Sequence, residues 1–230
     1  MPSLDYKSKP ADIFLIAGGQ QSKNNEAILA EVLKSSKNKA PNIAYIGTAS
    51  NDNKEFFLML RKIIMDAGAK NVTLVPIVRR FDPDKARDIL LASDVVFISG
   101  GDVDLGMKYL RQRNLIPFFR ELYDGGKLFC GISAGAIMLC RNWMHWRDPD
   151  DDDTVELLDC LGFAPLLCDV HDEQDNWIEM KRLLGFFPQG TACYGIPAEG
   201  ALRVAPDGKI TAIGSLPIKF IKKGTDIIIV

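Results

Sequence analysis

The chain has 230 residues, of which 47% are hydrophobic and 25% are charged, and its formal net charge is −2. This length and composition indicate a globular protein with a sizeable core, so we predict a single domain over residues 1–230. The slightly acidic balance argues against a general nucleic-acid binder, which would carry a basic face. No apolar run approaches the ~20 residues that span a bilayer. We therefore expect neither a nucleic acid nor a membrane as partner.

The five cysteines form no C-x-x-C pair, and most lie in apolar surroundings. Their odd number and spacing match neither a disulfide framework nor a zinc site, so we interpret them as reduced core residues. Residues 1–10 are polar and lack the apolar core of a signal peptide. These features together predict a cytoplasmic protein.

Short apolar segments alternate with amphipathic ones over the first 132 residues. The expected strands are 12–17, 42–47, 72–77, 94–99 and 128–132. The expected helices are 26–37, with Asn24 or Asn25 as cap, then 56–67, one starting at Asp82-Pro83, 103–111 and 116–123. Such alternation predicts an α/β fold: a doubly wound, mostly parallel sheet with helices on both faces.

The pattern changes after Arg141. We expect a strand at 161–170, a helix at 177–184 and then short segments at 192–196, 201–204, 210–213, 219–221 and 227–230. Asp207-Gly208 is a strong hairpin signal. These features predict antiparallel C-terminal strands, with residues 205–230 at a sheet edge. The acidic run 148–153 reads as a solvated loop, because it lacks the glycine and distal glutamate of a calcium site. We expect no metal and no cofactor.

One pentapeptide stands out for its chemistry. Gly131-Ile132-Ser133-Ala134-Gly135 fits the G-x-S-x-G nucleophile elbow, in which a serine sits on a strained turn between a strand and a helix. We expect that a side chain at Gly131 or Gly135 would collide with neighbouring backbone. The alternative is a tight strand–helix turn that happens to hold a serine.

The alternating strand–helix pattern favours the interpretation of Ser133 as a catalytic residue. Ser133, Gly18-Gly19, Thr48 and Gly100-Gly101 all follow the carboxyl ends of expected parallel strands, where α/β proteins build their sites. A serine hydroxyl also needs a base. The chain has two histidines. His171 ends an expected strand, and we predict it as the base.

His145 lies in an aromatic cluster, and we interpret it as a packed or surface residue. Oxyanion stabilisation requires two N–H donors. We assign these to Ala134, directly after the serine, and to Gly101 on the adjacent strand end.

The residues alone do not decide which acid orients the base. Glu199 lies in a defined turn, Ile196-Pro197-Ala198-Glu199-Gly200, which suits a fixed orienting role. Asp148 and Asp150 in the acidic loop are the alternatives, and they would give the serine–acid–histidine order of α/β-hydrolases. We favour Glu199.

The segments 98–102, 131–136 and 195–202, together with the strand end at His171, resemble the peptidase E (aspartyl dipeptidase) and cyanophycinase family of serine peptidases. The resemblance covers roughly residues 12 to 205. It implies a class I glutamine amidotransferase-like, flavodoxin-like fold. It also implies Ser133 as nucleophile, His171 as base and an acidic third member that maps best onto Glu199. One departure is Asp102-Val103 after the glycine pair, where many members carry Asn-Thr.

The resemblance further implies small peptide substrates with an N-terminal or β-linked aspartyl residue. A substrate carboxylate would need a cation, for which Arg182 is better suited than Lys181, and Asp102 is a further expected substrate contact. We expect a monomer or homodimer. The alternatives are another acyl hydrolase, such as an esterase or amidase, or a binding protein without activity on the same fold. A glutamine amidotransferase is disfavoured because Ser133 stands where that chemistry uses cysteine.

Overall fold

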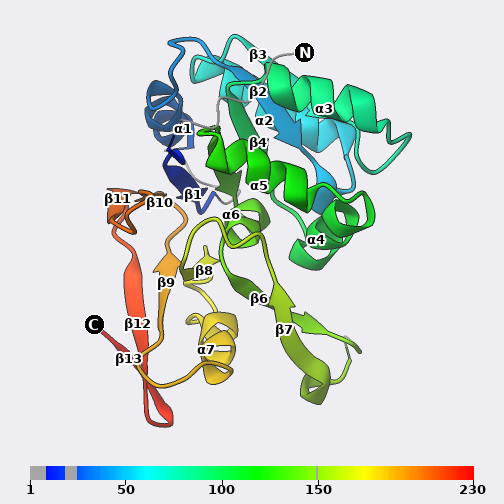
Figure 1. Cartoon of the computed structure of the whole chain (residues 1–230). Helices are drawn as coiled ribbons and strands as arrows, with labels where there is room; N and C mark the ends of the chain where they lie inside the picture. Colours follow the sequence, from blue (N-terminus) through cyan, green and yellow to red (C-terminus); the bar gives the residue numbers. More distant parts are fainter. Residues whose placement is uncertain (1–8, 19–24, 149) are drawn as a thin grey trace.

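A seven-stranded sheet forms the centre of the computed structural model, which describes residues 9–18, 25–148 and 150–230 (Figure 1). Five neighbouring strands run parallel, and two more extend one edge antiparallel. In spatial order they are β11 (Ile210–Gly214), β10 (Gly200–Val204), β1 (Ile13–Ile16), β5 (Leu128–Ile132), β4 (Val95–Ile98), β2 (Asn42–Ile46) and β3 (Asn71–Val75). The predicted α/β class, with its mostly parallel sheet and antiparallel C-terminal strands, is confirmed.

Helices cover both faces of this sheet, as the alternation of side chains along its strands requires. Ile13 and Leu15 of β1 belong to one buried cluster, and Phe14 and Ile16 belong to the other. The second cluster also holds the apolar sides of α1 (Asn25–Lys34) and α2 (Lys54–Asp66). The first holds those of α3 (Pro83–Ala92), α4 (Val103–Gln112), α5 (Ile116–Asp124) and α6 (Ala134–Leu139).

A smaller four-stranded sheet lies beside the first, with α7 (Ile178–Gly185) packed against it (Figure 1). Its strands are β13 (Asp226–Ile229), β12 (Ile218–Lys223), β9 (Ala192–Ile196) and β8 (Leu167–Val170). Strands β8 and β9 are parallel, whereas β12 and β13 continue antiparallel. The short C-terminal segments predicted from sequence are therefore strands. Asp207-Gly208 forms the predicted turn, because the Ala205 N–H donates to the Lys209 carbonyl across it.

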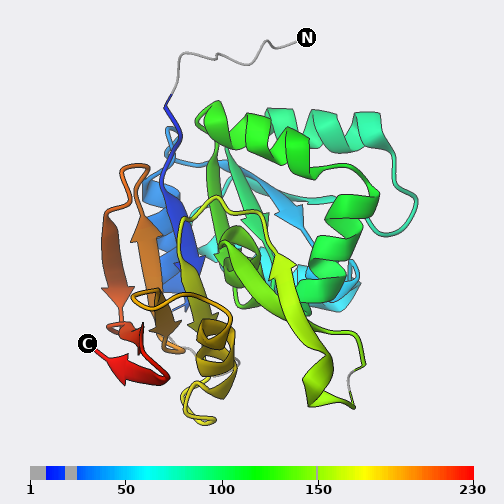
Figure 2. The same cartoon turned by 60° about the horizontal axis from the view of Figure 1, so that its bottom comes forward.

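A two-stranded ribbon, β6 (Asn142–Trp146) and β7 (Val155–Asp159), follows α6 and was not predicted from the sequence. The described residues also include two short 3-10 turns, η1 (Thr48–Ser50) and η2 (Asp152–Thr154). Figures 1 and 2 show the ribbon and α7 extending in the same direction, away from α3 and α5. No helix in the described part of the chain is long and apolar enough to cross a membrane.

The strand predicted at 161–170 is correct only for its second half. Residues 161–164 instead lie over the end of α6, where Leu161 donates its N–H to the Met138 carbonyl, and Phe163 and Ala164 donate to Leu139. The last carbonyls of a helix have no partner within it, so this loop supplies the missing donors. Its apolar residues are buried for this reason rather than as part of a sheet.

Three expectations concern residues outside the described ranges. These are the polar segment at residues 1–8, Gly19 of the first glycine pair and a helix cap at Asn24. Asn25, the alternative cap, is the first residue of α1 itself.

Helix α6 lies so close to β4 that only glycine fits at Gly135. A Cβ atom there would stand 2.1 Å from the Ile98 carbonyl oxygen. We predict that Gly135→Ala lowers the free energy of unfolding by about 3 kcal/mol, because backbone must move to relieve the overlap. Urea denaturation of the purified protein measures this.

Gly185→Ala is the matched control, because a Cβ at Gly185 meets nothing within 4 Å. It should change the stability by less than about 1 kcal/mol. Equal effects of the two substitutions would contradict the close-contact explanation.

Candidate active site

Ser133 has the strained backbone expected of a nucleophile elbow. It joins β5 to α6 with φ 54° and ψ −126°, a conformation that non-glycine residues rarely adopt. A Cβ on Gly131 would stand 2.2 Å from the Gly135 carbonyl oxygen. The expected collision at both flanking glycines is therefore present in the structure. The backbone turns so tightly here because both neighbours of the serine lack side chains.

His171 meets this serine from the other sheet. It follows β8 directly, with φ 46°, and its N–H donates to the Ile196 carbonyl of the neighbouring strand β9. The Ser133 Oγ lies 2.8 Å from the His171 Nε2. This is hydrogen-bond distance, so the imidazole can accept the hydroxyl proton when Nε2 is unprotonated. The structure thus brings together the predicted nucleophile and the predicted base.

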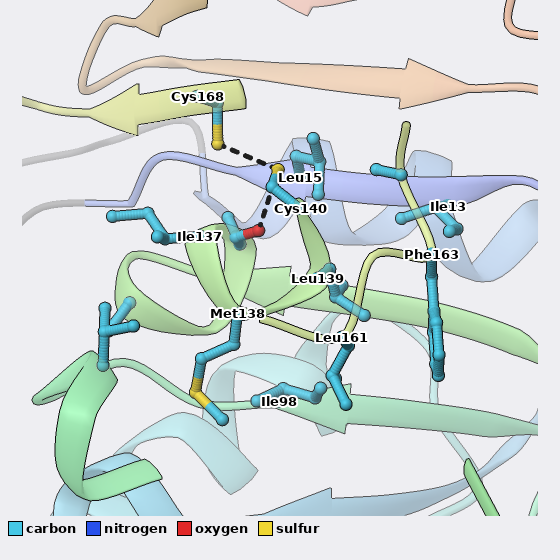
Figure 3. Packing of buried hydrophobic residues seen from close by; sticks show 14 of the residues in the cluster. Ile13, Leu15, Ile98, Ile137, Met138, Leu139, Cys140, Leu161, Phe163 and Cys168 are labelled. Carbon is cyan, nitrogen blue, oxygen red and sulfur yellow. Dashed lines mark hydrogen bonds between the residues drawn. The ribbon is translucent and has the colours of Figure 1, made fainter. Parts of the chain in front are cut away.

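The packing of α6 against β8 fixes this distance (Figure 3). Cys140 at the end of α6 and Cys168 in β8 have their sulfur atoms 3.3 Å apart, and both side chains are fully buried. Cys168 precedes His171 by three residues, and α6 begins directly after Ser133. All five cysteines are free in the structure. Burial raises the pKa of Cys130, three residues before the serine, which leaves that thiol protonated and unreactive.

The glycine pair after β4 lies against the elbow. A Cβ on Gly100 would stand 3.0 Å from the Ser133 Cβ, and one on Gly101 would stand 2.1 Å from the Ala49 carbonyl oxygen. Gly101 has φ 137°, which an L side chain would strain. In the described part of the chain, the N–H groups of Gly101 and Ala134 have no hydrogen-bond acceptor. Both predicted oxyanion donors are thus available to a ligand.

Asp102 has a structural role at the next position. Its carboxylate accepts from the Leu105 N–H at 2.7 Å and caps α4, while its own N–H donates to the Ala49 carbonyl. The exposed side chain remains beside the candidate oxyanion donor Gly101. Asp102 therefore holds the glycine loop in place through these two hydrogen bonds.

The three predicted acids are placed differently. Glu199 lies half-buried in the turn between β9 and β10, which connects the two sheets near His171. Among the described residues its carboxylate makes no hydrogen bond with the His171 ring. Asp148 and Asp150 are exposed in the loop between β6 and β7, where the Asp148 carboxylate accepts the Asp150 N–H. Nothing in the described structure links either of them to His171.

A hydrogen bond ties the histidine turn to the turn of Glu199. The Glu173 Oε1 accepts the Ala198 N–H at 2.7 Å. Because His171 lies two residues before Glu173 and Glu199 directly follows Ala198, this bond holds the two turns side by side. No pattern in the sequence pointed to Glu173.

A pair of carboxyl groups flanks the histidine, and sequence reasoning missed both. Asp169 is 3% exposed, and its Oδ1 accepts the Val170 N–H while its Oδ2 has no partner in the described structure. Burial, with the charges of Asp172 and Glu179, raises the pKa of Asp169 to about 7. Burial, with the charge of Asp175, also raises the pKa of Asp172, and the charge of His171 opposes this shift. The charge of the candidate base His171 thus acts on Asp172, its neighbour in sequence. The only sequence signal for Asp172 is its position next to the histidine.

Two further side chains were assessed from sequence. Arg182, the expected contact for a substrate carboxylate, is exposed in the last turn of α7. Burial raises the pKa of Glu179, and the charge of Arg182 opposes this shift. The neighbouring Lys181 donates to the Asn176 carbonyl. His145, interpreted as a packed or surface residue, is half-exposed, and its Nδ1 lies 2.7 Å from the Asp104 Oδ2. This contact fastens the β6–β7 ribbon to α4.

The sequence pattern of Peptidase family S51 matches residues 13–211. The chain belongs to this family. The "Uncharacterized peptidase YgaJ" of Bacillus subtilis is 24% identical over 157 residues, which are 66% of this chain and 64% of that protein. The "Imidazole glycerol phosphate synthase subunit HisH" of a Cyanothece strain is 33% identical over 66 residues, or 29% of this chain and 31% of that one. These alignments thus span less than two thirds of either relative.

Solved structures share the fold over nearly the whole chain. A peptidase from an acI-B1 Actinobacterium superposes with a TM-score of 0.69 at 17% identity, covering 96% of this chain and 94% of that one. A "Putative Peptidase E Protein" from Listeria monocytogenes EGD-e superposes with a TM-score of 0.68, also at 17% identity, covering 90% and 100%. The suspected relationship to peptidase E is thereby confirmed at the level of family and fold.

The buried Asp169 makes stability depend on pH. Its pKa is higher in the folded chain than in the unfolded one, so the folded state retains a proton that the unfolded state loses. Between pH 4 and about pH 7, this group should lower the free energy of unfolding by up to about 1.4 kcal/mol per pH unit. We predict that Asp169→Asn flattens the decline, measured by urea denaturation across this range.

Asp175→Asn is the control, because Asp175 is exposed on the same turn. It should leave the slope of stability against pH close to that of the unchanged protein. If Asp169→Asn also retained the full slope, the buried acid would not be the cause.

Proposed function

We propose that the chain is a serine peptidase of family S51 that hydrolyses small peptides through an acyl-enzyme. The observation that carries this proposal is the 2.8 Å contact between the Ser133 Oγ and the His171 Nε2, with the serine on a strained elbow. Membership of a peptidase family supports peptide bonds as the target and implies a peptide substrate. A single domain over residues 1–230 remains part of the proposal.

In the proposed mechanism, the Ser133 Oγ attacks the substrate carbonyl carbon while the His171 Nε2 takes the hydroxyl proton. The carbonyl π electrons move onto oxygen, where the free N–H groups of Gly101 and Ala134 stabilise the negative charge. Collapse of this intermediate breaks the C–N bond, and His171 gives the proton to the leaving amine. Water then repeats the sequence on the acyl ester, which releases the acid and restores Ser133.

The imidazolium that forms at each step needs a negative partner. Glu199 remains our choice for the acid that orients His171, because its turn is fastened to the histidine turn through Glu173. Asp172 is the rival, because it is the carboxylate whose pKa the charge of His171 influences. Asp148 and Asp150 receive no support from their place in the β6–β7 loop.

For the substrate, we propose small peptides with an N-terminal or β-linked aspartyl residue. The basis is the resemblance of the glycine loop and elbow to peptidase E and cyanophycinase. Arg182 on α7 is the proposed contact for the aspartyl carboxylate, and Asp102 beside Gly101 is a second proposed contact. An esterase or amidase would use the same serine, and a binding protein would not acylate it.

The nucleophile is tested by Ser133→Ala. We expect the substitution to lower kcat for the preferred dipeptide by about four to six orders of magnitude, because the attacking atom is absent. A fluorophosphonate probe should label the unchanged protein once, at Ser133, as measured by intact mass and peptide mapping. An unlabelled protein would support the binding protein, and retained hydrolysis in the variant would exclude this mechanism.

Glu199→Gln and Asp172→Asn together test the orienting acid. Both variants keep the side-chain size and remove one charge. The true orienting acid should lower kcat by about 10⁴-fold, as for the aspartate of a serine–histidine–aspartate triad, whereas the other should change it by less than about 10-fold. Steady-state kinetics at saturating substrate measures this, with Asp148→Asn as a control. Equal small effects would show that neither carboxylate orients the base.

A further inference from the structure

A wide, open depression of about 520 Å³, called the cleft below, lies beside the candidate oxyanion loop. Its lining combines that loop with the start of α2 and the turn before it: Ser50, Asn53, Glu55, Phe56, Met59 and Gly101. The Gly101 N–H is the proposed oxyanion donor, so this cleft adjoins the position of the attacked carbonyl. The side chain of a substrate residue next to the scissile bond would therefore lie close to the cleft.

The cleft is held rigidly to the catalytic loop. The Asp102 N–H donates to the Ala49 carbonyl, and a Cβ on Gly101 would overlap the same oxygen. Ala49 belongs to the 3-10 turn at Thr48–Ser50, which leads into α2. A side chain bound here would therefore be positioned relative to the same backbone that stabilises the oxyanion.

Two polar side chains of the lining, Ser50 and Asn53, already have hydrogen-bond partners. The Ser50 hydroxyl donates to the Gly47 carbonyl, and the Asn53 side chain accepts the Phe56 N–H as the cap of α2. What remains toward the cleft is largely apolar: the half-buried Phe56 and Met59, which is 50% exposed. A ligand group without hydrogen-bonding atoms suits such a surface, because burying it removes apolar area from water.

Glu55 is the one charged residue among those lining the cleft. It is exposed, and among the described residues its carboxylate has no hydrogen-bond or ion-pair partner. The Glu55 carboxylate would repel an acidic substrate side chain bound here, and the lining contains no cation to offset this repulsion. The cleft is thus a poor place for the aspartyl carboxylate that the proposed function includes.

We propose that this cleft is a side-chain subsite that receives a large apolar residue, such as leucine, methionine or phenylalanine, and disfavours acidic ones. The inference rests on the proposed peptidase function and adds a substrate class to it. The aspartyl residue and the apolar residue then lie on opposite sides of the scissile bond. Phe56 and Met59 contact the apolar chain, and Glu55 at the rim supplies the discrimination.

The test is a set of matched dipeptides, assayed for kcat/KM with the full chain. One series keeps aspartate first and varies the second residue among leucine, phenylalanine, alanine, lysine and glutamate, and a second series reverses the positions. In whichever position binds the cleft, leucine and phenylalanine should be preferred over alanine and glutamate. Met59→Ala should lower the kcat/KM preference for leucine and phenylalanine over alanine about 10-fold. The change should appear mainly in KM, because the lost contact is made in both the bound substrate and the transition state.

Leu58→Ala is the matched control, because Leu58 is 49% exposed on the same helix but does not line the cleft. It should leave all rates unchanged. Glu55→Gln should raise kcat/KM about threefold for the substrate with glutamate in the cleft and leave the alanine substrate unaffected. Asp88→Asn on α3 controls for a general change of surface charge.

The outcomes separate the two proposals. Hydrolysis with equal effects of Met59→Ala and Leu58→Ala would overturn the subsite and leave the peptidase standing. A preference for lysine that Glu55→Gln abolishes would overturn the apolar class in favour of a cationic one. No hydrolysis of any dipeptide, together with no labelling of Ser133 by a fluorophosphonate, would overturn both.

Discussion

The contact between α6 and β8 is the interaction on which the candidate site depends. Ser133 and His171 belong to different sheets, and no continuous strand order brings them together. Their meeting depends on packing between the helix after the serine and the strand before the histidine, with Cys140 and Cys168 fully buried at the contact (Figure 3). Buried side chains at close-packed density do not shift easily, so the contact holds the Ser133 Oγ and the His171 Nε2 at 2.8 Å.

The loop at residues 160–164 reinforces the same helix. Helix α6 has six residues, too few to be stable by itself, and it ends against donors from this loop. Burial on all sides and satisfied terminal carbonyls compensate for its shortness. The elbow can therefore hold an unfavourable serine conformation, because the surrounding structure determines it more strongly than local preference does.

The sequence predicted the large parallel sheet well because each strand is a nearly unbroken apolar run, followed by glycine or a turn. The strained turn at Ser133 and the close backbone approach at Gly101 were predictable because such turns leave local glycine patterns. The ribbon at Asn142–Trp146 was missed because its aromatic and polar residues do not follow a simple alternation. The buried Asp169 was missed for a different reason. Asp169 is buried because α7 packs against β8, and this tertiary contact cannot be predicted from a local sequence pattern.

The acid proposed to orient His171 could not be identified from sequence either, because its placement also depends on tertiary packing. Glu199 was favoured because it lies in a defined turn, and that turn does lie beside the turn of His171. The direction of the Glu199 carboxylate, however, depends on packing between the two sheets. Asp172 is exposed to the charge of His171 because the two residues are adjacent in sequence. Backbone conformation thus determines the placement of the proposed nucleophile and the proposed oxyanion donors. The charge around the base depends instead on how β8, β9 and α7 pack, and it can change without disturbing the elbow.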